Sequence, residues 1–329
     1  MEGVKPLPEG SFPTMITPFT PDGAIDWPCL AGLIEWYIAN GCTGLFACCL
    51  SSEMYNLTEE ERLQLAGFVS EKAAGRVSVV GSGTFGGAIE EQAAFVNKMA
   101  EKVDAVVVLP CQLCKEGDSE EVFKANVTKL LELTKCPLGV YECPAPYWRI
   151  LSAECLQWVA ATGRFIFHKD TCCKTAEIKA KLQALQSNAS GNPFRFYNAN
   201  VETLHFSNQL GGNGFSGISA NFYPMLHAYL CKSPSEANAN KIQRFISVAE
   251  QVVVDNYPAS AKVFLGLHDG FEISAHCRKG EYSFNEVQML HLRHMKGMLE
   301  DLCEQLGIAI VAPSRGDAAA APPPAPATA

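Results

Sequence analysis

The sequence has no excess of positive charge and no long apolar segment. Lysine and arginine number 26 against 35 aspartates and glutamates, so the net charge is −9. Such a chain is poorly suited to bind nucleic acid or an anionic membrane, since both attract positive charge. No apolar stretch reaches the roughly 18 residues needed to span a bilayer, and the first ten residues lack the apolar core of a signal peptide. We therefore expect a soluble, cytoplasmic protein whose partners include neither nucleic acid nor membrane.

The chain also lacks the dense cysteine framework of a small secreted domain, because its 14 cysteines are dispersed over 329 residues. We expect most of them to be reduced and packed as small apolar groups. Cys111 and Cys114 have a metal or redox spacing, but a zinc site needs about four converging ligands. His168 is expected to point away from the end of its strand, towards the helices. We expect neither a metal nor a cofactor.

What the sequence does contain is a regular alternation of apolar runs and amphipathic stretches. The apolar runs predict eight strands, over Phe12–Thr17, Gly44–Cys49, Val77–Gly81, Ala105–Leu109, Leu138–Tyr141, Phe165–Lys169, Phe194–Asn198 and Gly214–Ser219. Each run is followed by a segment long enough for a helix, and Thr58 with Glu61 forms a capping box at the start of one helix. Eight strand–helix units over about 220 residues predict an α/β fold, a (β/α)8 TIM barrel with a C-terminal helical region.

An open, doubly wound sheet is the competing fold, but it requires a glycine-rich phosphate loop after the first strand. Here Thr17-Pro18-Phe19-Thr20-Pro21 occupies that place. The glycine-rich segment 211–219 runs from a helix into a strand, which is the reverse of a dinucleotide-binding motif. We divide the chain into a barrel core (1–222), the last barrel helix with a C-terminal helical region (223–312), and a disordered Ala/Pro tail (313–329).

Two polar side chains end neighbouring strands of the predicted barrel. Lys169 ends the sixth strand and Tyr141 the fifth, 28 residues earlier, about one strand–helix–strand unit. A lysine amine attacks a ketone only when neutral, and an ordinary pKa leaves about one part in a thousand neutral at pH 7. An apolar barrel would lower that pKa, and Tyr141 could move protons. The alternatives are that Lys169 only reaches solvent and that Tyr141 is a core aromatic.

The other groups expected at the mouth of the barrel are small and polar. Ser51 and Ser52 could bind a substrate carboxylate or form a plain turn. Further candidates for substrate binding are Thr17, Asn200, Ser216, Gly217 and Ser219. No cluster of carboxylates is predicted there, which disfavours two-metal and paired-carboxylate reactions. If the barrel is right, several thiols also surround the mouth and could make it prone to oxidation.

At these residues the chain resembles the dihydrodipicolinate synthase / N-acetylneuraminate lyase family, the pyruvate-dependent class I aldolases. The resemblance covers roughly residues 10–306. The motifs that carry it, in order, are Thr17-Pro18-Phe19, the turn Cys49-Leu50-Ser51-Ser52-Glu53, Tyr141-Glu142-Cys143-Pro144, Phe167-His168-Lys169-Asp170-Thr171, and Gly211 to Ser216 with Ala220-Asn221. The resemblance implies a Schiff base on Lys169, proton transfer by Tyr141 and a homotetramer.

The chain departs from the family where a second substrate would bind. Leu50 replaces the first hydroxyl of the carboxylate turn, and the segment from Leu109 to Leu113 lacks the tyrosine that the synthase places after its proline. Pro146 stands where the synthase has an arginine, and Arg149, three residues further on, is the candidate to replace that arginine. We therefore expect a lyase acting on pyruvate or another 2-oxo acid by carbon–carbon cleavage or formation. The alternatives are a 2-keto-3-deoxy-sugar-acid dehydratase, the synthase proper, and a catalytically silent barrel that binds a 2-oxo acid.

Overall fold

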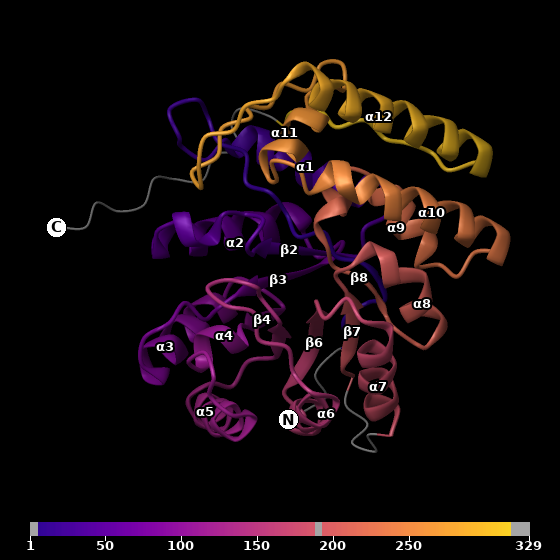
Figure 1. The fold of residues 1–329 in the computed structure, drawn as a ribbon. Coiled ribbons are helices and arrows are strands. Elements are labelled where there is room, and N and C mark those ends of the chain that lie inside the picture. Colours follow the sequence, from indigo (N-terminus) through magenta and orange to yellow (C-terminus); the bar gives the residue numbers. More distant parts are fainter. Residues whose placement is uncertain (1–5, 188–192, 317–329) are drawn as a thin grey trace.

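Eight parallel strands form the centre of the molecule, as the sequence predicts (Figure 1). The computed structural model describes residues 6–187 and 193–316. The strands are β1 (Gly10–Ser11), β2 (Gly44–Cys48), β3 (Ser78–Ser82), β4 (Ala105–Val108), β5 (Leu138–Tyr141), β6 (Phe165–Asp170), β7 (Arg195–Asn198) and β8 (Gly214–Phe215). They pair in chain order from β2 to β8, and β8 pairs with β1.

The barrel is closed between β1 and β2 by irregular backbone contacts. The Thr43 N–H donates to the Ser11 carbonyl at 3.0 Å, and the Phe46 N–H donates to the Pro13 carbonyl at 3.0 Å. The first strand is short and ends before the predicted Phe12–Thr17 begins, because Pro13 offers no N–H to extend the ladder. The last strand is likewise short, and the chain turns into the 3₁₀ helix η3 (Ile218–Asn221).

Helices follow the strands and cover the outside of the barrel. The longer helices of the first seven units are α1 (Trp27–Ala39), α2 (Glu59–Ala73), α3 (Ile89–Ala100), α5 (Glu120–Leu133), α6 (Ala153–Ala161), α7 (Thr175–Gln186) and α8 (Leu204–Gln209). Shorter elements are η1 (Met54–Asn56), α4 (Pro110–Leu113) and η2 (Val201–Thr203). The predicted capping box at Thr58 is confirmed, because its side chain accepts from Glu61 N–H and Glu61 accepts from Thr58 N–H.

Aromatic side chains fill the barrel interior. The Phe12 ring lies 4.7 Å from the Tyr197 ring, and the Phe167 ring lies 5.8 Å from the Phe46 ring, measured between centroids. All four side chains are fully buried. Gly44 is needed for this packing, because a Cβ there would lie 2.0 Å from the Phe12 ring. The barrel is thus a packed core below its mouth, not a channel.

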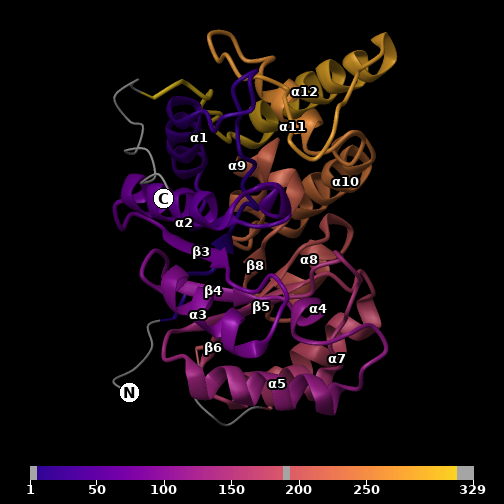
Figure 2. The same ribbon diagram turned by 90° about the vertical axis from the view of Figure 1, so that its left-hand side faces the viewer.

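The C-terminal helices pack together against one side of the barrel, at the top of Figures 1 and 2. They are α9 (Pro224–Leu230), α10 (Glu236–Val253), α11 (Ala259–Leu265) and α12 (Glu286–Leu306). Their apolar faces join those of α1 and α2 in one buried cluster. A buried ion pair, with Lys262 Nζ 3.1 Å from Glu53 Oε1, fastens α11 to the turn that follows β2. The C-terminal region therefore belongs to the same packed body as the barrel.

The predicted tail (313–329) lies mostly outside the described residues. Its described start contacts α1: Arg315 Nη2 lies 2.8 Å from Asp26 Oδ1, and the Gly316 N–H donates to the Pro28 carbonyl. All fourteen cysteines are free thiols. Among the described residues, no helix combines the length and the apolar character needed to cross a membrane.

Candidate active site

A cavity of about 350 Å³ opens at the carboxyl ends of the barrel strands. Lys169 of β6 and Tyr141 of β5 both line it, and the two residues are register partners in the sheet. Enzymes with this fold place their active sites at this end of the barrel. The structure therefore brings the two strand-end residues together, as the sequence indicated.

The Lys169 side chain is buried among apolar and aromatic groups. Lys169 is only 4% exposed, and its Nζ lies 3.8 Å from the centroid of the Tyr141 ring. Burial lowers the pKa of Lys169 to about 8, against the raising effect of Cys49 and Cys143. About a tenth of the amine is therefore neutral at pH 7, enough to act as a nucleophile towards a carbonyl group.

The Tyr141 hydroxyl lies among thiols. Burial, followed by the proximity of Cys143 and Cys49, holds its pKa well above the ordinary value, so the phenol keeps its proton near neutrality. The Cys143 thiol lies beside Cys111 and Tyr141, and the interaction with Cys111 is the main cause that lowers the pKa of Cys143 to about 7. The protonated Tyr141 side chain thus lines the same cavity as the Lys169 amine.

The turn after β2 presents one of its two serines to the cavity. Ser51 lines the cavity, and its hydroxyl donates to Thr14 Oγ1 at 3.1 Å. The Ser52 hydroxyl instead closes the turn, since it donates to the Cys49 carbonyl at 2.7 Å and accepts from the Cys49 N–H at 2.8 Å. Leu50 lines the cavity at the position where the family carries a hydroxyl.

The remaining predicted residues divide between the cavity and the surrounding packing. Asn200 and Gly217 line the cavity. Thr17 does not, because its hydroxyl donates to the Ser52 carbonyl and so supports the turn. Ser216 is fully buried with its hydroxyl unbonded. The Ser219 hydroxyl lies 2.9 Å from His227 Nε2 and fastens η3 to α9.

Arg149 does not take the place of the missing family arginine. Its guanidinium donates to the carbonyls of Asp118 and Ser119, at 2.6 and 3.0 Å, and it is not among the residues that line the cavity. These carbonyls belong to the segment that leads into α5, so the side chain holds two loops together.

Among the cavity-lining residues that were not predicted from the sequence, four are large polar or aromatic ones. They come from loops and from the C-terminal region: Trp148, Glu250, Tyr257 and Lys279. The Tyr257 hydroxyl accepts from Asn221 Nδ2 at 2.8 Å and contacts the hydroxyls of Ser51 and Thr14. A signal did exist for Glu250. It comes directly after Ala249 in α10, on the face of the helix where Ile246, Ala249 and Val253 are buried. A carboxylate on such an apolar face is unusual.

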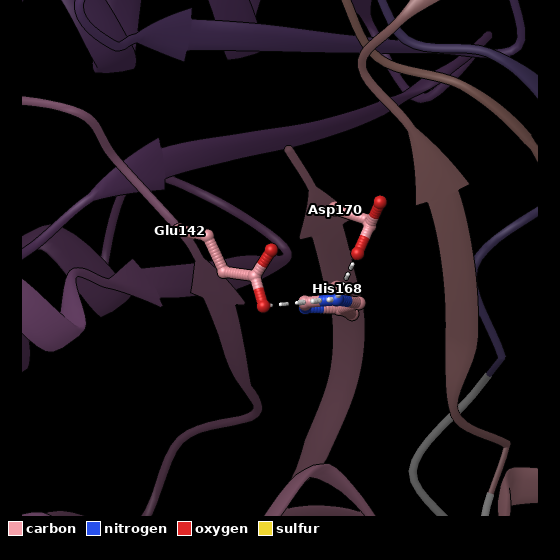
Figure 3. Close-up of side chains that lie close together, drawn as sticks. All are labelled: Glu142, His168 and Asp170. Carbon is pink, nitrogen blue, oxygen red and sulfur yellow. Dashed lines mark ion pairs between the residues drawn. The ribbon is translucent and has the colours of Figure 1, made fainter. Parts of the chain in front are cut away.

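Behind the cavity, a buried charged cluster joins the ends of β5 and β6. Glu142, His168 and Asp170 alternate with Tyr141 and Lys169 along the strands and therefore face outward, as expected for His168 (Figure 3). Lys181 of α7 reaches into the cluster, with its Nζ 2.6 Å from Glu142 Oε1 and 2.7 Å from Asp170 Oδ1.

This cluster holds the only three metal-type ligands that come together among the described residues. The Lys181 ammonium already lies between the two carboxylates and compensates their charge, whereas both ring nitrogens of His168 are buried without a hydrogen-bond partner. Burial tends to raise the pKa of Asp170, but the nearby His168 ring, with its Nε2 3.7 Å from Asp170 Oδ1, and the Lys181 charge hold it well below its usual range. Glu142 also accepts from the Thr171 N–H at 3.0 Å, which fixes the chain just after Lys169.

Known proteins are similar in sequence to this chain over most of its length. A 4-hydroxy-tetrahydrodipicolinate synthase of Polynucleobacter asymbioticus is 26% identical over 281 residues, which is 84% of this chain and 90% of that protein. The same enzyme of Roseobacter denitrificans is 28% identical over 238 residues, 71% of this chain and 79% of its own length.

Solved structures agree on the fold. Dihydrodipicolinate synthase of Thermotoga maritima superposes with a TM-score of 0.80 at 20% identity, covering 89% of this chain and 99% of that one. A prophage protein of the same family from E. coli K12, solved with pyruvate, gives a TM-score of 0.75 at 23% identity, covering 92% and 99%. The Dihydrodipicolinate synthetase family model matches residues 7–293. The chain therefore belongs to the dihydrodipicolinate synthetase family, whose members are lyases of the class I aldolase type.

Proposed function

We propose that the protein forms a Schiff base between Lys169 and pyruvate or a longer 2-oxo acid, and makes or breaks the adjoining carbon–carbon bond. The observation that carries the proposal is the buried Lys169 amine, with its pKa lowered to about 8, directly over the Tyr141 ring. A silent binding barrel would have no need of a desolvated amine. Solved relatives in complex with pyruvate, from Acinetobacter baumannii and E. coli K12, support a small 2-oxo acid as the ligand.

The chemistry follows from the placement of the groups. The neutral amine adds to the ketone carbon and water leaves, which gives an iminium ion. In the cleavage direction the substrate's C4 hydroxyl loses its proton, and the C3–C4 bond breaks with its electrons entering the iminium as an enamine. An aldehyde is released, and protonation and hydrolysis of the enamine return pyruvate and the free amine. Tyr141 moves the protons, while the Ser51 hydroxyl and the N–H groups of its turn hold the carboxylate.

The second substrate differs from that of the synthase in this proposal. Leu50 replaces the hydroxyl of the family's carboxylate turn in the cavity wall, and Arg149 is engaged with backbone carbonyls elsewhere. We therefore favour a lyase for another 2-oxo acid. The cytoplasmic location and the homotetramer stay predictions from the sequence and the family.

Borohydride trapping tests the proposed function. Incubation with pyruvate and sodium borohydride should reduce the iminium to a stable secondary amine, and mass spectrometry of the digested protein should place the added group on Lys169. Borohydride without pyruvate should leave the peptide unmodified. A folded protein with an unmodified Lys169 would rule out the mechanism.

The rate of trapping should depend on pH with a midpoint near 8. Below that value the Lys169 amine is protonated, so the rate should rise about tenfold per pH unit; above it the rate should level off. Single-turnover trapping between pH 6 and 10 measures the curve. A midpoint near the ordinary lysine value of about 10.4 would show that burial does not activate the amine.

A further inference from the structure

Helix α10 contributes a carboxyl group to the wall of the cavity that also contains Lys169. Glu250 lies on the packed side of the helix, beside the buried residues Ala249 and Val253. It lines the cavity, and its Oε2 atom is buried without a hydrogen-bond partner among the described residues. The amide nitrogen of Asn200, which follows β7, lines the same cavity and is likewise buried and unpartnered. Buried polar atoms are normally bonded, so the pair is suited to a bound ligand.

The charge state of Glu250 restricts that ligand. Burial, and then the nearby Glu202 carboxylate, raise the pKa of Glu250 to about 8. At neutral pH the group is therefore mostly a carboxylic acid, which both donates and accepts hydrogen bonds. The Asn200 nitrogen only donates. A hydroxyl group can bond to either atom, since it can donate to the carboxyl and accept from the amide.

The size of the cavity allows a ligand longer than pyruvate. Its volume of about 350 Å³ lies within the range of roughly 300–1,000 Å³ that is typical of small-molecule sites. The exposed Trp148 adds an apolar ring to the wall, and its Nε1–H donates to Thr171 Oγ1 at 2.8 Å. Carbon atoms beyond the reacting bond thus have room and an apolar surface beside them.

We propose that Glu250, with Asn200, is a specificity-determining residue that binds hydroxyl groups on the part of a 2-oxo acid beyond its third carbon. The preferred substrate is then a polyhydroxylated 2-oxo-3-deoxy acid, and a second carboxylate in the same place is disfavoured by the nearby Glu202 carboxylate. This assignment rests on the proposed Schiff-base function of Lys169. Lys279, which also lines the cavity, is the group that would favour a dicarboxylic substrate instead.

The wild-type protein supplies the first test. Pyruvate release is measured with three 2-oxo acids of six carbons that all carry a C4 hydroxyl: one with hydroxyls on C5 and C6, one without them, and one ending in a carboxylate. We expect the first compound, with hydroxyls on C4, C5 and C6, to give a kcat/KM roughly ten- to hundredfold above that of the other two. This is the effect expected when a substrate gains one buried hydrogen bond. Equal values, or preference for the dicarboxylic acid, would overturn the proposal.

Variants at position 250 give the second test. Glu250→Leu should raise KM for the trihydroxy compound by roughly tenfold or more, with little change for the compound lacking C5 and C6 hydroxyls. Glu250→Gln, which still donates and accepts, should stay near wild type. Gln251→Leu is the matched control, because its side chain is exposed on the same helix. An unchanged KM in Glu250→Leu would overturn the assignment.

Trapping with pyruvate separates this proposal from the one on which it rests. All three variants should still be labelled on Lys169 by pyruvate and borohydride, which also shows that they are folded. If Lys169 is labelled but the three substrates have the same kcat/KM, only the role of Glu250 is refuted. Failure of wild-type labelling refutes the Schiff-base function itself.

Discussion

Lys169→Met is expected to abolish turnover, with a loss on the order of 10⁴-fold or more in kcat, the scale seen when a covalent nucleophile is removed. Methionine has a similar length and suits the apolar surroundings of a side chain that is only 4% exposed. The protein should therefore fold at least as well as wild type, because a buried ammonium no longer has to lose its water. Pyruvate release and borohydride labelling measure the chemistry, and urea unfolding measures the stability.

Lys174→Met is the matched control for this variant. Lys174 lies five residues further along the chain, and its ammonium pairs with Glu177 at the surface. Its replacement should change neither labelling nor turnover. Persistent turnover by Lys169→Met would mean that the reaction does not pass through an amine at this position.

Lys181→Met is expected to destabilise the protein by about 3–5 kcal/mol, the cost of removing one partner from a buried ion pair. The substitution leaves Glu142 and Asp170, both fully buried, without the ammonium between them. The free energy of unfolding from urea titration measures the effect. Lys174→Met again serves as the control, because its exposed pair with Glu177 should contribute nothing measurable.

The consequence of Lys181→Met for the site should be distinct from its consequence for stability. Glu142 bonds to the Thr171 N–H, so a disturbed cluster should slow labelling of Lys169 even in the folded fraction. A loss below about 1 kcal/mol, as for a surface pair, would show that water or His168 compensates for the missing charge.

The barrel and its reactive pair could be predicted from the sequence because both depend on local patterns. Buried parallel strands are short apolar runs, and a strand's last residue points to a known end of the barrel. Alternation along β6 also placed His168 on the face opposite Lys169. The first strand was predicted too far along the chain, since β1 ends at Ser11 and Pro13 cannot extend its ladder. The last strand was predicted too long, because the turn at Gly217 ends its ladder early.

The rest of the site depends on contacts between distant parts of the chain. Glu250 and Tyr257 reach the cavity only because the C-terminal helices pack beside the barrel. Ser52 and Thr17 are polar residues near the right strand ends, but their hydroxyls are used within the turn. Residue type and position along a strand do not reveal which polar atoms are already bonded.

The half-exposed indole of Trp148 gives the protein an optical signal of its own. It lines the cavity, and its N–H is bonded to Thr171, two residues beyond the amine. The other three tryptophans, Trp27, Trp36 and Trp158, are not among the residues that line the cavity. The emission of one indole therefore responds directly to what occupies the mouth. Occupancy of the cavity can therefore be followed by tryptophan fluorescence of the unlabelled protein. A compound that only binds should give a lasting change in emission, whereas the change caused by a compound that is consumed should decay as it is turned over.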